Sequence, residues 1–195
     1  MTRLAIFSSP KPFTNPHIAI IQRNAIQSWK ALGDEVEVWL VGEEEGVAKA
    51  AKELGVGFIP NVLRNDSGTP RIDSIFDLIR QNSQADLMCY VNADILLFPE
   101  FLEAAKKVRI SFDRFLMIGR RWDAPVTDLL KFKPGWSEEF LVWAKKAGKL
   151  HRAAGSDYFI FPRETFNAVP AFAVGRAGWD NWMIYHARYE KMPVI

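Results

Sequence analysis

Cysteine, long apolar runs and an excess of charge of one sign are all scarce in this sequence of 195 residues. The lone cysteine, Cys89, has no partner for an internal disulfide, and it excludes a zinc site built from several cysteines. It lies in an apolar run, where a buried bystander is more common than a reactive thiol. No apolar stretch reaches the roughly 20 residues of a membrane-spanning helix, and the start of the chain lacks the apolar core of a secretory signal. We therefore expect a cytoplasmic protein without a transmembrane segment.

The charges nearly cancel. Lysine and arginine number 25 against 23 aspartates and glutamates, a formal net charge of +2. Nucleic-acid binders usually concentrate more positive charge, so we expect no nucleic-acid partner. With 49% apolar residues, the composition is that of a globular protein with a well-filled core. The length predicts a single domain over residues 1–195, and because the chain stops at Ile195 within an apolar run, we expect it to be truncated at its C-terminus.

The apolar pattern alternates between the periods of strands and helices. Short apolar runs predict strands over residues 4–8, 36–41, 58–59, 87–91, 115–118 and 158–161. Apolar residues spaced three and four apart predict helices over residues 18–32, 47–54, 99–108, 138–147 and 180–191. A further helix is expected to start at Thr69-Pro70, and Ser137 is expected to cap the helix over 138–147. This alternation predicts an α/β domain with a mainly parallel sheet.

Ligands of open α/β sheets bind at the carboxyl ends of the strands. The loop over residues 8–13, after the first predicted strand, contains no glycine. It therefore does not fit the phosphate loops of Rossmann dehydrogenases and P-loop enzymes, or the basic, glycine-rich loop of a nucleotidyltransferase. Its prolines and Phe13 leave two interpretations open, a cradle for a nucleobase or an ordinary strand-to-helix connection.

Asn92 and Asp94 directly follow the fourth predicted strand. Alternation along an extended chain places both side chains on the same side, so both oxygens are expected to face one ion. Mg²⁺ and Mn²⁺ prefer carboxylate and carbonyl ligands. The alternative is structural, because Asn and Asp also end strands by bonding their own backbone.

Residues 90–97 resemble the Asp-X-Asp motif of the GT-A glycosyltransferases, the nucleotide-diphosphosugar transferases, where it holds a divalent metal on the donor's diphosphate. Residues 155–163 are similar to the acceptor-side strand of such proteins, and residues 175–182 to the Gly-Trp-acidic segment that supplies the base in inverting members. Two features differ. Asn92 stands at the first acidic position, and a late metal-binding histidine has no counterpart before Ile195.

The resemblance implies a Rossmann-like, mainly parallel sheet flanked by helices in a three-layer sandwich. It implies metal-assisted transfer of a sugar, with inversion, from a UDP- or GDP-linked donor to a glycan or other hydroxyl acceptor. Asp180 is then the catalytic base, and Asp94 and Asn92 hold Mn²⁺ or Mg²⁺. The expected donor-binding residues are Phe7, Ser8, Ser9, Arg71, Asn92, Ala93 and Asp94, and the expected acceptor- or sugar-binding residues are Asp157, Trp179 and Asn181.

The residues alone leave alternatives open at most of these positions. Asp180 stands at a predicted helix start, where Asp is a favoured N-cap. Asp157 can satisfy a turn, and Arg71 can be an exposed helix residue instead of a phosphate ligand. Arg120-Arg121, after the fifth predicted strand, is either a ligand-binding pair or solvated loop charge. For the whole chain, the alternative is a non-catalytic domain that binds nucleotide sugar, glycan or a protein partner.

Overall fold

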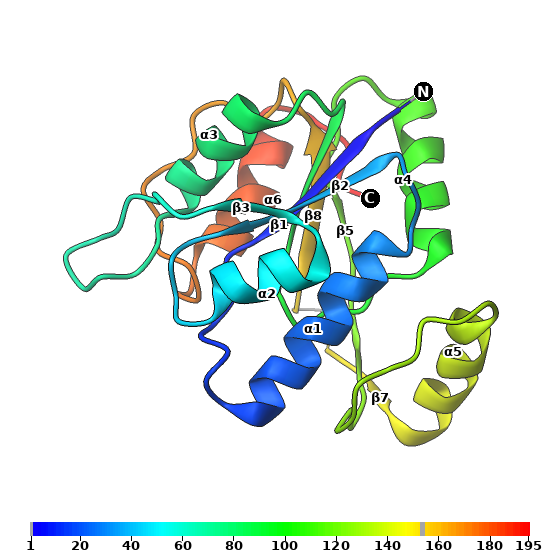
Figure 1. The fold of residues 1–195 in the computed structure, drawn as a ribbon. Coiled ribbons are helices and arrows are strands. Elements are labelled where there is room, and N and C mark those ends of the chain that lie inside the picture. Colours follow the sequence, from blue (N-terminus) through cyan, green and yellow to red (C-terminus); the bar gives the residue numbers. More distant parts are fainter. Residues whose placement is uncertain (1, 153–154) are drawn as a thin grey trace.

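A six-stranded sheet in the order β3-β2-β1-β4-β8-β5 forms the centre of the computed structural model, which describes residues 2–152 and 155–195 (Figure 1). β1 pairs in parallel with β2 and β4, and β2 with β3, whereas β8 is antiparallel to β4 and β5. The prediction of a mainly parallel sheet is confirmed, and the reversed direction of β8 is the feature that the strand pattern did not predict. The strands are β1 (Leu4–Ser8), β2 (Val36–Val41), β3 (Gly57–Ile59), β4 (Leu87–Val91), β5 (Met117–Ile118) and β8 (Tyr158–Pro162).

Helices cover both faces of this sheet, so the predicted three-layer sandwich is confirmed (Figure 1). Successive side chains of β1 alternate between the two apolar clusters, because neighbouring strand residues point to opposite faces. Leu4 and Ile6 pack in the cluster with α1, α2 and α4, and Ala5 and Phe7 in the cluster with α3 and α6. The helices are α1 (Pro16–Lys30), α2 (Val47–Leu54), α3 (Ile72–Asn82), α4 (Pro99–Ser111), α5 (Trp136–Ala147) and α6 (Trp179–Tyr189).

The predicted helix start at Thr69-Pro70 is wrong. α3 begins at Ile72, and Arg71 before it is extended, with φ −97° and ψ 134°. Asn65 and Thr69 instead close a tight loop, in which the Asn65 amide donates to the Thr69 carbonyl at 2.9 Å. The Asn65 side chain also accepts from the Thr69 amide at 2.9 Å. These hydrogen bonds use the backbone of Thr69 for the loop, so its local helix-start signal is overridden.

The predicted cap of α5 is also wrong, because Gly135 precedes the helix and Ser137 lies in its first turn. The Ser137 hydroxyl donates to Glu138 Oε2 at 2.8 Å instead of capping the backbone. Two short strands that were not predicted, β6 (Trp122–Asp123) and β7 (Lys149–Leu150), pair beside this helix. We call residues 120–152 the α5 lobe, and Figure 1 shows α5 and β7 projecting from the body of the fold.

The last residues of the sequence lie beside β5. The Ile118 amide donates to the Ile195 carbonyl at 3.0 Å, and the Ile195 amide donates to the Leu116 carbonyl at 2.9 Å. Within the described ranges, none of the helices combines the length and the apolar character that crossing a membrane requires.

Candidate functional site

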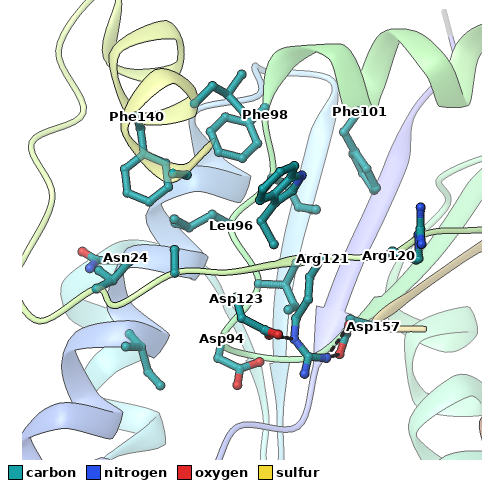
Figure 2. Close-up of a pocket in the computed structure, with 18 of the residues that line it drawn as sticks. Asn24, Asp94, Leu96, Phe98, Phe101, Arg120, Arg121, Asp123, Phe140 and Asp157 are labelled. Atoms are coloured by element: carbon teal, nitrogen blue, oxygen red, sulfur yellow. Dashed lines mark hydrogen bonds and ion pairs between the residues drawn. The ribbon is translucent and has the colours of Figure 1, made fainter. Parts of the chain in front are cut away.

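A cavity of about 860 Å³ lies at the carboxyl edge of the sheet, bounded by α1, the segment after β4 and the α5 lobe. Asp94 and Asp157 line it from the ends of β4 and β8, and Arg120, Arg121 and Asp123 line it from the α5 lobe. Figure 2 shows Asp94, Arg121, Asp123 and Asp157 gathered at one end of this space. The cavity therefore lies where ligands of open α/β sheets bind.

The chain turns at Asn92 instead of continuing as a strand, since the Ile95 amide donates to the Asn92 carbonyl at 3.1 Å. The prediction that alternation aims Asn92 and Asp94 at one ion is therefore wrong. Asp94 is exposed and lines the cavity, and its carboxylate makes no hydrogen bond or ion pair within the described residues. Asn92 turns aside, and its Nδ2 donates to Asp157 Oδ1 at 3.1 Å. Ala93, between them, is half-buried in the turn.

Few groups here suit a divalent ion. In residues 2–152 and 155–195, no three or more His, Cys, Asp or Glu side chains are grouped so as to hold a metal. Asp94 remains as a carboxylate with free oxygens. Mg²⁺ usually takes one or two protein carboxylates when phosphates supply other ligands. The residues present therefore fit a metal only where a diphosphate contributes most of its ligands.

Asp157 is engaged by protein partners. Arg121 Nη1 lies 2.7 Å from both of its carboxylate oxygens, and the Asp157 side chain is only 8% exposed. Asp157 also lines the cavity, and because a carboxylate can accept further hydrogen bonds, its contact with sugar hydroxyls stays a prediction. Sequence reasoning missed this pair, since its members lie 36 residues apart and neither carries a local signal for the other.

Arg121 also binds Asp123, which links the pair to His151. Arg121 Nε donates to Asp123 Oδ1 at 2.7 Å, and His151 Nδ1 lies 2.7 Å from Asp123 Oδ2. The hydrogen bond with His151, and then that with Arg121, lowers the pKa of Asp123. Burial lowers the pKa of Arg121, but the hydrogen bonds with Asp157 and Asp123 outweigh burial and raise it overall. Arg121 is thus a fixed cation at the polar end of the cavity.

Trp179 does not present a free face to a sugar, which corrects the prediction for this residue. It is 7% exposed, and its ring packs against Tyr90 and Phe159 with centroid separations of 4.9 Å and 4.7 Å. Burial of this large aromatic ring contributes to the stability of the core. Gly178 occupies the N-cap position of α6, so the alternative of Asp180 as the N-cap does not hold.

Asp180 is half-buried in the first turn of α6, where its Oδ1 accepts from the Asn181 amide at 2.8 Å. Neither Asp180 nor Asn181 is among the residues lining the cavity. Burial, and then the negative charge of Asp94, raises the pKa of the Tyr90 phenol. The Tyr90 ring packs edge-on against Trp179, the first residue of α6.

Polar atoms without protein partners mark the ends of β1 and β2. Within the described residues, Ser8 Oγ and Glu44 Oε2 are buried and make no hydrogen bond. A Cβ atom on Gly42 would lie 2.4 Å from Glu44 Oε2 and 3.4 Å from Ser9 Oγ, so these groups converge above Gly42. Leaving buried polar atoms unpaired costs free energy, and this edge therefore fits the polar atoms of a ligand.

Phe7 and Arg71 were also predicted to bind the donor, and the side chains of both contact other protein groups. Phe7 is fully buried and packs edge-on against Phe76 and Tyr90, so its side chain belongs to the core and the prediction of a nucleotide contact needs correction. Arg71 precedes α3, and its guanidinium binds Asp73 through Nε at 3.1 Å and Nη2 at 2.5 Å. These hydrogen bonds and the charge of Asp73 raise the pKa of Arg71.

The sequence matches no protein-family model and no curated protein. Solved structures do match. A mannosyltransferase from Pyrobaculum calidifontis, in complex with GDP-mannose and Mn²⁺, has a TM-score of 0.61 at 13% identity over 100% of this chain and 54% of its own. A cytidylyltransferase from Leptospira borgpetersenii has 0.59 at 12% identity, over 100% of this chain and 76% of its own. Glucosyl-3-phosphoglycerate synthase from Mycobacterium tuberculosis, in complex with Mn²⁺ and UDP, has 0.58 at 13% identity, over 99% and 69%.

This chain has the GT-A fold. The resemblance to nucleotide-diphosphosugar transferases is thus confirmed at the level of the fold, which is as far as identities of 12% and 13% reach. Among these neighbours the GT-A fold supports both sugar transfer and nucleotidyl transfer, so the fold alone does not choose a reaction. The chain spans about half of the Pyrobaculum mannosyltransferase.

Proposed function

We propose that this chain is a glycosyltransferase that moves a sugar from a nucleotide-diphosphate donor to a hydroxyl acceptor. The observation that supports this most strongly is the exposed Asp94 carboxylate, free of protein partners within the described residues, beside a large cavity at the carboxyl edge of a GT-A sheet. The nucleoside of a UDP- or GDP-linked donor is assigned to the polar atoms of Ser8, Ser9 and Glu44. Arg71 and the turn at Ala93 are assigned to the diphosphate side of the same edge.

In the proposed reaction, the bond between the sugar's anomeric carbon and the diphosphate oxygen breaks, and the electron pair leaves with the diphosphate. The acceptor oxygen bonds to the anomeric carbon from the opposite side, which inverts it, and its proton passes to a carboxylate base. We assign that role to Asp180 from the resemblance of residues 175–182, and because Asp180 does not line the cavity, the reacting hydroxyl is expected to extend beyond the residues that line it. The Asn181 amide at Oδ1 orients that carboxylate. Mn²⁺ or Mg²⁺, when bound at Asp94, would neutralise charge on the leaving diphosphate.

The alternative is a non-catalytic domain that binds nucleotide sugar or glycan. Asn92 at the first position of the acidic motif favours it, because the motif then offers a metal only one carboxylate, that of Asp94. A cytoplasmic location stays a prediction from the sequence.

Thermal unfolding with UDP or GDP, with and without Mn²⁺, tests donor binding. A nucleotide at 100 times its Kd adds about 2.7 kcal/mol to the free energy of unfolding, which raises Tm by about 5 to 10 °C in a chain of this size. We expect Asp94→Asn to remove the Mn²⁺-dependent part of the rise. Asp113→Asn, which changes a fully exposed carboxylate paired with Arg109, is the matched control. No rise with any nucleotide contradicts the proposed function.

Turnover separates the enzyme from the binding domain. Asp180→Asn is expected to keep the nucleotide-dependent rise in Tm and to lose hydrolysis or transfer of the donor sugar. Nucleotide binding without any turnover by the unmodified chain supports the non-catalytic alternative. A fully active Asp180→Asn chain contradicts the assignment of the base.

A further inference from the structure

The cavity beside Asp94 has two ends of different chemistry. Its polar end carries Asp94, Arg121, Asp123 and Asp157. Figure 2 shows Leu96, Phe98 and Phe140 lying away from this cluster, toward α5. The cavity is also lined by other apolar side chains from α1 and the α5 lobe, namely Ile21, Val126 and Leu141.

The apolar end is held open by packing around it. The Asn24 side chain on α1 donates to the Asp128 carbonyl at 2.8 Å and accepts from the Leu130 amide at 2.9 Å. Phe98 stacks on Trp136 of α5 with a centroid separation of 5.4 Å and lies 6.0 Å from Phe140. These contacts fasten the α5 lobe against the body without filling the space between them. Contacts within the protein therefore hold the apolar walls of the cavity in place.

A nucleotide sugar does not suit this apolar end. Its phosphates and hydroxyls need polar partners, and removing them from water without such partners is costly. An apolar ligand surface, in contrast, gains by leaving water. The cavity volume of about 860 Å³ lies within the usual range of roughly 300–1,000 Å³ for small-molecule sites.

We propose that the acceptor is an amphiphile whose hydroxyl-bearing head lies at the polar end, near Asp94, and whose apolar body fills the space between α1 and α5. This inference rests on the proposed function, because it names the acceptor class of the same site. It predicts that affinity follows the apolar length of the acceptor. Arg121, fixed by Asp157 and Asp123, then contacts the head.

Alkyl β-glucosides from methyl to octyl, each kept below its critical micelle concentration, test this with the complete chain. Isothermal titration calorimetry is expected to show Kd falling about fourfold for each added methylene until the cavity is filled. An affinity that does not change with chain length overturns the inference. Nucleotide-dependent stabilisation, measured on the same preparation, reports on the proposed function separately.

Adjacent residues of α5 provide a matched pair of variants. Leu141 lines the cavity, whereas Val142 is 58% exposed and does not. Leu141→Gln is expected to weaken octyl glucoside binding about tenfold and to leave methyl glucoside binding unchanged, and Val142→Gln is expected to bind both like the unmodified chain. Ala144→Leu, a second cavity-lining change, is expected to shorten the longest alkyl chain that still gains affinity.

The outcomes distinguish the two proposals. Octyl glucoside binding that is the same in Leu141→Gln, Ala144→Leu and Val142→Gln overturns the cavity as the acceptor site. If alkyl chains do not bind but nucleotides still raise Tm, the acceptor class is wrong and the proposed function stands. If alkyl chains bind and no nucleotide does, the cavity binds amphiphiles but the proposed function fails, and with it the assignment of the amphiphile as an acceptor.

Discussion

The Asp157 carboxylate shows how one residue organises the site through its contacts with the protein. Arg121 contacts both of its oxygens, and Asn92 donates to one of them. Its backbone carbonyl also accepts from the Asn92 amide at 2.9 Å. Asp157 thereby ties the turn after β4 to the start of β8 and orients Arg121 beside the cavity. It is a positioning residue.

Asp157→Asn is expected to lower the free energy of unfolding by about 2–3 kcal/mol, because it leaves a half-buried guanidinium without its main counter-charge. Urea unfolding at neutral pH measures this loss. Asp123→Asn is the matched control, since it removes the other carboxylate partner of Arg121 at an exposed position, and its loss is expected to be much smaller. Equal losses for the two variants would show that burial of Asp157 does not carry the effect.

At the scale of elements, the α5 lobe is attached to the body by a small number of specific contacts. The Asn24 side chain makes two hydrogen bonds to the segment before α5, and Phe98 stacks on Trp136 at the start of the helix. Ala144 is the buried apolar residue of α5, whereas Val142 and Trp143 are exposed. A lobe with so little buried apolar surface opens locally more readily than the central sheet.

Asn24→Ala is expected to open the segment around Asp128 and Leu130, because their carbonyl and amide lose their partners. We expect a loss of about 1–2 kcal/mol in the free energy of unfolding and faster hydrogen exchange at the Leu130 amide. Gln27→Ala, on the same helix, is the control, since the Gln27 side chain makes no hydrogen bond within the described residues. Unchanged exchange at Leu130 would show that Asn24 does not hold the lobe.

For the whole molecule, the two helical layers enclose β1 and β4 completely. Both strands are buried along their entire length, and Cys89 lies at the middle of β4 between β1 and β8. Burial raises the pKa of the Cys89 thiol. The reactive thiolate is thus suppressed as long as the sheet is intact.

Labelling of Cys89 with Ellman's reagent is therefore expected to occur only through global unfolding. The native chain should react orders of magnitude more slowly than the chain in denaturant, and the rate should rise with urea in parallel with unfolding. A nucleotide that binds the folded state should slow the reaction further. Rapid labelling under native conditions would show that the central sheet opens locally.

Local patterns predicted most of the elements, and a helix-start pattern failed where a neighbouring loop used the same backbone. The apolar runs of β1 and β4 are reliable signals, because a strand covered on both faces is apolar throughout. Thr69-Pro70 carries a helix-start pattern, but pairing of Thr69 with Asn65 uses the same backbone. At the site, Asp94 was found from its place after β4, whereas Glu44 lies in a run of three glutamates that also fits a solvated helix cap.

The order of strands and helices, and with it an α/β sheet carrying Asp94 at its carboxyl edge, was determined by the sequence alone, because apolar periodicity is a local property. The tertiary structure decided which side chains are free at that edge. Phe7 and Trp179 are taken into the core, Asp157 is paired with Arg121, and Asn24 holds backbone 104 residues away to enclose the cavity. Such contacts depend on how distant segments pack, which the spacing of residues along the chain does not specify.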